Sequence, residues 1–162
     1  MKRTRGITLI VGIGICAVLT SSSAWAESSP FVGRWHWNAT QSTVPPGEPP
    51  ASDVVSEISR ADGVYVTWSI TIVTPDGQPH VAAFDAAADG EFHPISTDTT
   101  AAARLNGNTL EVTAKGLKGF SDTQTCTVSA DLRQMTCRGV LTDEQGRTAS
   151  YVDVYDRMEK SR

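Results

Sequence analysis

The chain has 162 residues, of which 40% are hydrophobic, and carries 14 Lys and Arg against 18 Asp and Glu, a net charge of −4. This acidic balance argues against a nucleic acid or an anionic membrane surface as the partner, because like charges repel. The length is typical of one domain that can bury a core without a metal ion.

The start of the chain predicts a secretory signal peptide over residues 1–26. Lys2, Arg3 and Arg5 form a basic start, residues 7–19 form a largely apolar run, and the small residues Ala24 and Ala26 make a cleavage site. The apolar run is too short to cross roughly 30 Å of hydrocarbon as a helix. We therefore expect export and no membrane span.

Cleavage after Ala26 would leave residues 27–162 as a single exported domain, periplasmic or extracellular, with 11 basic and 18 acidic residues and a net charge of −7. Lipid attachment at Cys16 is the alternative, although that cysteine lies deep inside the apolar run. The remaining pair, Cys126 and Cys137, is expected to form a disulfide in an exported protein. A reactive or metal-binding pair is the second interpretation.

The rest of the chain predicts short strands. Residues 31–38 place Phe31, Gly33, Trp35 and Trp37 on one face, and Val32, Arg34 and His36 on the other. β-Branched and aromatic residues crowd the strongest strand, residues 64–73, and Asp-Gly and Asn-Gly turns join the segments. Strands are expected at residues 31–38, 53–60, 64–73, 80–87, 91–97, 100–105, 110–115, 121–129, 134–142 and 148–158.

The two cysteines suggest a register for one hairpin. If Cys126 faces Cys137 in an antiparallel pair, Val128 faces Met135 and the turn is a two-residue loop centred on residues 131–132. Closing so short a loop stabilises the fold by up to ~3 kcal/mol in the chain-entropy model.

No segment keeps a helical period over three turns, so the fold class is all-β. Sequential hairpins leave two edges exposed, and closing the sheet removes them. We expect an antiparallel up-and-down barrel of about 8–10 strands, with a two-sheet β-sandwich as the alternative.

The chain resembles small exported bacterial proteins of the lipocalin-like (calycin) type, most of which have no known function. Besides regular Asp-Gly turns, the resemblance rests on Phe31-Val-Gly-Arg-Trp35, Thr127-Val-Ser-Ala-Asp131 and Val154-Tyr-Asp-Arg157. In such barrels a first-strand tryptophan closes one end and an arginine of the last strand packs across it. The resemblance thus implies structural roles for Gly33, Trp35 and Arg157.

The expected function is binding of a small hydrophobic ligand inside the barrel. Val66, Trp68, Ile70 and Val112 are expected to line the cavity, although the same side chains could simply fill the core. The alternative is a packed barrel that acts through its surface as a protein-interaction or inhibitory module, with an exposed apolar patch.

We expect no enzyme activity, because no nucleophile, acid–base pair or phosphate loop can be assembled from the sequence. We also expect no cofactor and no metal. The three histidines, His36, His80 and His93, are too far apart in sequence to make a local metal motif.

Overall fold

The computed structural model describes residues 29–45 and 51–159, so the predicted signal peptide lies outside the described residues. The described part contains ten strands and one 3₁₀ turn. The elements are β1 (Gly33–Trp37), β2 (Asp53–Ala61), β3 (Tyr65–Val73), β4 (Pro79–Ala87), β5 (His93–Pro94), β6 (Thr100–Asn106), β7 (Thr109–Lys115), η1 (Leu117–Gly119), β8 (Ser121–Val128), β9 (Gln134–Thr142) and β10 (Thr148–Arg157).

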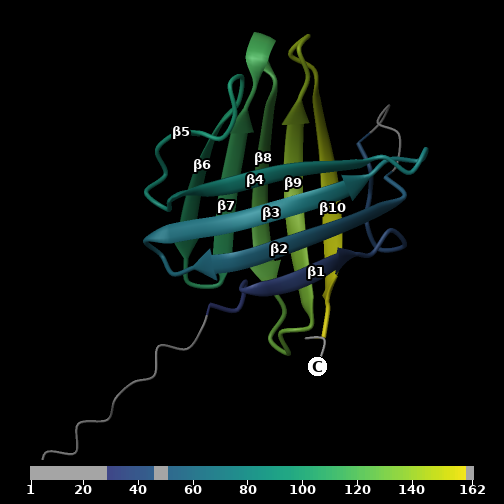
Figure 1. Ribbon diagram of the computed structural model, residues 1–162, viewed down its shortest axis with the longest axis vertical. Helices are drawn as coiled ribbons and strands as arrows, with labels where there is room; N and C mark the ends of the chain where they lie inside the picture. The colour runs from purple at the N-terminus through teal and green to yellow at the C-terminus, as the bar shows by residue number, and fades with distance from the viewer. Residues whose placement is uncertain (1–28, 46–50, 160–162) are drawn as a thin grey trace, which may run out of the picture.

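The strands form one antiparallel sheet in the order β4-β3-β2-β1-β10-β9-β8-β7-β6-β5, which curls into a nearly closed up-and-down barrel (Figure 1). In this view β1–β4 cross the front, and β6–β10 run steeply behind them. β1 pairs with β2 on one side and with β10 on the other. The predicted all-β barrel is therefore confirmed, in preference to a sandwich.

The barrel has one seam, between β4 and the short β5, where the sheet order ends. The segment that follows β4 bridges this seam. The amide of Gly90 donates to the carbonyl of Ala103 at 2.9 Å, and Asp89 pairs with Arg104 as an isolated bridge. A few contacts of irregular backbone thus cover an edge that strand pairing leaves open.

Alternation along each strand decides which side chains point into the barrel. On β2 and β3, Ile58 lies opposite Trp68 and Ser56 opposite Ile70, all pointing inward. The largest fully buried side chains are Trp35, Phe31, Phe84 and Val66. The core is one cluster that includes these four side chains together with others such as Ile58, Leu110 and Met135.

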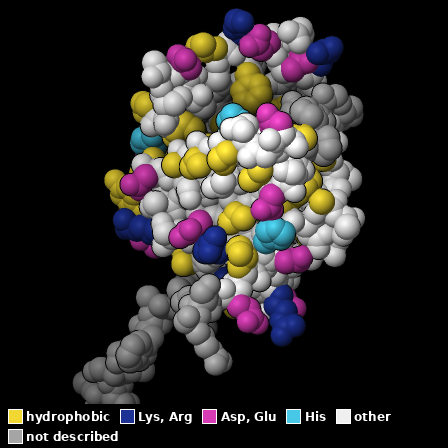
Figure 2. Space-filling view, turned by 45° about the vertical axis from the view of Figure 1, so that its right-hand side comes forward, with side chains coloured by type: hydrophobic (Ala, Val, Ile, Leu, Met, Phe, Trp, Pro, Cys, Tyr) yellow, Lys and Arg dark blue, Asp and Glu magenta, His cyan; other side chains and the backbone are white. Residues whose placement is uncertain are grey.

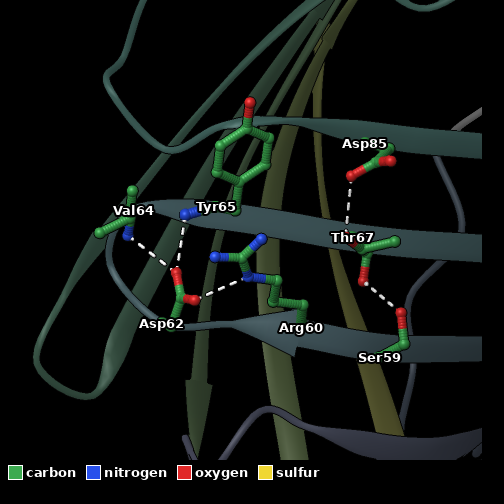
Figure 3. Close-up of polar contacts among 7 residues, drawn as sticks. All are labelled: Ser59, Arg60, Asp62, Val64, Tyr65, Thr67 and Asp85. Carbon is green, nitrogen blue, oxygen red and sulfur yellow. Dashed lines mark hydrogen bonds and ion pairs between the residues drawn. The ribbon is translucent and has the colours of Figure 1, made fainter.

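The β2–β3 hairpin shows how an Asp-Gly turn is built (Figure 3). Gly63 takes a φ of +80°, which suits glycine. The Asp62 carboxylate accepts bonds from the amides of Val64 and Tyr65, at 3.0 and 2.8 Å, and from Arg60 at 2.6 Å. The Tyr65 amide, the Arg60 side chain and the Val64 amide lower the pKa of Asp62 to about 2.

The β8–β9 hairpin has the predicted register, with Cys126 opposite Cys137 and Val128 opposite Met135, and the two cysteines form a disulfide. Its loop is longer than the predicted two residues. Strand pairing stops at Val128, and the Ser129 amide donates to the carbonyl of Gln134 at 2.8 Å. Residues 130–133 therefore turn the chain, with Leu132 at a φ of +61°.

The predicted strand at residues 91–97 is mostly wrong. Only His93–Pro94 pairs with β6. Proline has no amide hydrogen to donate, so Pro94 limits pairing at this edge of the sheet.

One end of the barrel is closed by Trp35 and Arg157. The guanidinium carbon of Arg157 lies 4.0 Å from the centre of the Trp35 ring. The same guanidinium donates to three backbone carbonyls, those of Val32 at 2.9 Å, Leu132 at 2.5 Å and Pro30. Arg157 thus ties the residues before β1 to the β8–β9 loop.

Gly33 makes room for this closure. A Cβ at Gly33 would lie 2.5 Å from Nη1 of Arg157, and the residue has a φ of +151°, which L side chains rarely adopt. The Trp35 indole N–H donates to the carbonyl of Phe31 at 2.9 Å, so the buried ring leaves no unpaired donor.

Candidate ligand-binding site

A pocket of about 400 Å³ opens at the end of the barrel opposite the Trp35–Arg157 pair. In Figure 1 this end lies toward η1 and the β9–β10 turn. Its apolar wall comes mainly from the ends of β2, β3 and β9 and includes Val54, Ile70, Ile72 and Leu141. Strand alternation directs these side chains inward, where they border the pocket together with the aromatic side chains Trp37, Phe120, Tyr151 and Tyr155.

The polar part of the pocket is a hydrogen-bonded cluster on β8 and β10. The Tyr151 hydroxyl donates to Asp122, with distances of 2.7 and 2.8 Å to the two carboxylate oxygens. Nε2 of Gln124 lies 2.7 Å from the Tyr151 hydroxyl and 2.9 Å from Oδ2 of Asp122, and donates to both. Tyr151 therefore acts as a donor to the carboxylate and an acceptor from the amide.

Gly139 allows this cluster to form. It lies on β9 between Tyr151 of β10 and Gln124 of β8, directly opposite both in the register. A Cβ at Gly139 would lie 2.0 Å from Cζ of Tyr151, so the phenol ring occupies the space of the missing side chain. The ring can thus cross β9 and reach Asp122 on the far side.

The second carboxylate of the pocket is Asp153, which is half-buried on β10. The Trp37 indole N–H donates to its Oδ1 at 2.9 Å. Burial raises the pKa of Asp153, and the nearby charge of Asp122 raises it further, against the lowering effect of the Trp37 hydrogen bond. Burial and the same carboxylates also raise the pKa of Tyr151 and Tyr155, so both phenols stay neutral.

Neither pocket carboxylate has a basic partner in the part of the chain that the structure describes. The ion pairs found there, within 4.0 Å, all lie elsewhere; examples are His36 with Asp53 and Arg147 with Asp143. The donors to Asp122 and Asp153 are instead an uncharged hydroxyl, amide and indole. Excess negative charge therefore remains at the inner wall of an otherwise apolar pocket.

The four residues predicted to line a ligand cavity are not all at this pocket. Ile70 lines it. Trp68 and Val112, together with Ile70, border a separate void of about 30 Å³ deeper in the barrel, which is close to the size of one water molecule. Val66 is fully buried in the core.

Sequence reasoning missed the polar lining residues, although the pattern contained them. Tyr151, Asp153 and Tyr155 alternate along one face of the last strand, and Asp122 and Gln124 share the face of Cys126 on β8. A carboxylate on the same strand face as inward-pointing aromatic side chains is the sequence signal for such a polar lining. The residues predicted to be structural, Gly33, Trp35 and Arg157, lie at the opposite, closed end, and the disulfide lies between the two ends.

Within residues 29–45 and 51–159, no group of three or more His, Cys, Asp or Glu side chains is arranged to hold a metal ion. His36 and His93 instead pair with Asp53 and Asp89 on the outside of the barrel. None of the described helical segments is long and apolar enough to cross a membrane.

No protein-family model and no curated protein matches the chain. Solved structures do. One mutant of the fluorescent protein UnaG superposes with a TM-score of 0.56 at 18% identity, covering 82% of this chain and 99% of its own. Wild-type UnaG gives 0.53 at 18% identity, covering 79% and 97%.

The zebrafish ileal bile acid-binding protein, solved with cholic acid, superposes with a TM-score of 0.52 at 19% identity, covering 80% of this chain and 100% of its own. At such identities the likeness shows the fold alone. The solved structures that share the fold are calycin-type β-barrels, which agrees with the broader part of the expected resemblance. The narrower resemblance to exported bacterial proteins stays a prediction.

Proposed function

We propose that this barrel binds a small amphiphilic molecule at its open end. The observation that carries the proposal is the pocket of about 400 Å³, which has an apolar wall and a small set of polar groups from β8 and β10. This combination is typical of small-molecule sites, in which apolar contact supplies most of the affinity and a few polar groups fix orientation. The cholic acid complex of a barrel with a similar fold supports the same interpretation.

The proposal is for binding rather than catalysis. Tyr151, Asp122 and Gln124 are bonded to one another, and Tyr151 and Tyr155 have raised pKa values, which make these phenols poor acids near neutral pH. Export accompanies the proposal, and rests on the basic start, apolar run and Ala24–Ala26 site of the sequence. The Cys126–Cys137 disulfide fits an oxidising compartment.

A surface-acting module is the weaker alternative. It calls for a filled interior and a continuous exposed apolar patch. The interior is filled around Trp35 and Phe84 but hollow at the other end. On the face shown in Figure 2, apolar side chains lie in small groups separated by polar and charged ones.

The test is titration with Nile red, an uncharged apolar dye, in wild type and two tryptophan variants. Ala51→Trp would place a large ring in the pocket that Ala51 lines, whereas Ala130→Trp adds the same ring on the exposed loop at the closed end. We expect saturable binding with one site in wild type and Ala130→Trp, and an affinity at least about tenfold weaker in Ala51→Trp. Equal affinities in the two variants would place the dye elsewhere.

A further inference from the structure

We propose that the polar end of the ligand is a cation, a protonated amine or a quaternary ammonium, held by Asp153 and Asp122. This inference rests on the proposed function, because it assigns the charge of the molecule that the pocket takes. It starts from the two carboxylates, which project into one apolar pocket from β10 and β8, the strands that flank β9.

No positive charge of a described residue balances the two carboxylates. Within the described ranges, the donors that reach these carboxylates are the Trp37 indole, the Tyr151 hydroxyl and the Gln124 amide, all uncharged. A carboxylate in a partly buried apolar site is stabilised by an opposite charge at hydrogen-bond distance. A ligand cation would supply that charge.

The two carboxylates differ in the hydrogen bonds that their oxygens accept. The Trp37 indole donates a hydrogen bond to Oδ1 of Asp153. The other oxygen of Asp153, Oδ2, accepts no hydrogen bond from a described residue, although Asp153 faces the pocket. Tyr151 and Gln124, in contrast, already occupy both oxygens of Asp122. Asp153 is therefore the direct acceptor for a ligand N–H, and Asp122 adds attraction at longer range.

Aromatic side chains share the pocket with the two carboxylates. Trp37, Phe120, Tyr151 and Tyr155 all line the same pocket. The faces of aromatic rings attract cations, and ammonium sites in proteins combine such rings with carboxylates. An organic cation suits this lining better than a metal ion, because Asp122 and Asp153 are the two carboxylates among the described lining residues and most of the other lining side chains are apolar.

A cationic ligand would distinguish this barrel from the zebrafish protein of similar fold. The zebrafish protein was solved with cholic acid, whose carboxyl group is ionised at neutral pH. An anion of that kind would add a third negative charge beside Asp122 and Asp153 and would be repelled. Two barrels with a similar fold would therefore bind ligands of opposite charge.

The experiment compares three probes with the same twelve-carbon chain: dodecylamine, dodecanol and dodecanoic acid. Each probe is titrated against the complex of the protein with Nile red, at neutral pH and physiological salt and below the concentration at which the probe aggregates, and displacement of the dye is measured. We expect wild type to bind the amine roughly tenfold or more tightly than the alcohol, and the carboxylic acid most weakly, because hydrogen bonds to charged groups exceed neutral ones in strength.

The variants are Asp153→Asn, Asp122→Asn and the control Asp85→Asn. Asp85 is exposed on the outside of β4, where it accepts a bond from Thr67 (Figure 3), so its replacement changes net charge equally without touching the pocket. We expect Asp153→Asn to lose most of the preference for the amine, Asp122→Asn to lose part of it, and Asp85→Asn to keep it.

Each result decides a different claim. If the alcohol and the acid bind as tightly as the amine, or if Asp153→Asn keeps the wild-type preference, the cation inference is overturned while the binding pocket stands. If wild type shows no saturable binding of Nile red, the proposed function fails, and the inference fails with it.

Discussion

The two ends of the barrel use the same kinds of side chain in opposite ways. At the closed end the positive charge of Arg157 is directed at three backbone carbonyls and the face of Trp35, so its donors have partners within the chain. At the open end the charges are negative, and Asp153 accepts only an indole N–H from the described residues.

A closed end that satisfies its own polar groups can serve stability alone. An open end that leaves charge uncompensated lowers the stability of the fold, which indicates a role in binding a molecule outside the chain. The comparison therefore assigns stability to Trp35 and Arg157, and ligand selection to Trp37, Asp122 and Asp153. Substitutions that are matched between the ends can break this assignment.

The largest difference is expected between two tryptophans of β1. Trp35→Ala should lower the free energy of unfolding by about 3–5 kcal/mol, because it leaves a cavity in a filled core and removes the ring under Arg157. Trp37→Ala should cost clearly less, because Trp37 borders a space that is already open. Urea unfolding with the disulfide intact measures both, and equal losses would contradict the division between the ends.

A smaller effect is expected at Gly139. An alanine there should cost about 1–3 kcal/mol and weaken ligand binding, because its Cβ would displace the Tyr151 ring from Asp122. The matched control is the same substitution in a Tyr151→Ala background, where the ring is gone and the cost of the alanine should vanish. An unchanged cost in that background would show that the glycine is needed for another reason.

The smallest expected effect is a pH-dependent change in the free energy of unfolding, which has opposite signs for Asp→Asn substitutions at two positions. The folded-state pKa of Asp153 is raised, so its charge destabilises the fold at neutral pH. Asp153→Asn should be more stable than wild type at pH 7, and the gain should shrink as the pH falls toward the usual carboxyl value of 3.8. Thermal unfolding of the two proteins between these pH values measures the difference.

Asp62 is the control, because its folded-state pKa is lowered to about 2. Its contribution is stabilising above the usual value of 3.8 and is lost as the pH falls through the folded value. Asp62→Asn should therefore be less stable than wild type at pH 7, with a difference that disappears only in stronger acid. The same sign at both positions would contradict the contrast between a buried and an exposed carboxyl.

Local rules in the sequence account for most of the fold. Alternation and Asp-Gly turns predicted nine of the strands closely, and one assumed cysteine pair gave the correct β8–β9 register. The failures come from backbone details. Pro94 shortens β5 to two residues, and the left-handed Leu132 makes a four-residue loop in place of a two-residue one.

The pocket was less predictable than the fold. Alternation shows that Trp68, Val112 and Asp153 point inward, but whether the interior is hollow depends on volumes contributed by strands far apart in sequence. The decisive pair, Gly139 with Tyr151, is a cross-strand relation between a missing side chain and a large one. Sequence spacing alone does not show which way such a ring leans.

The pairing of β1 with β10 has a consequence for how the molecule assembles. Among the described strands, every other pairing joins neighbours in the chain, whereas β1 and β10 are separated by more than a hundred residues. Long-range contacts form slowly because the intervening chain must first be confined. Hairpins can therefore form early in any order, and barrel closure waits until Arg157 of β10 pairs with Trp35 of β1. The pairing of the first and last strands is thus the step that completes the native state.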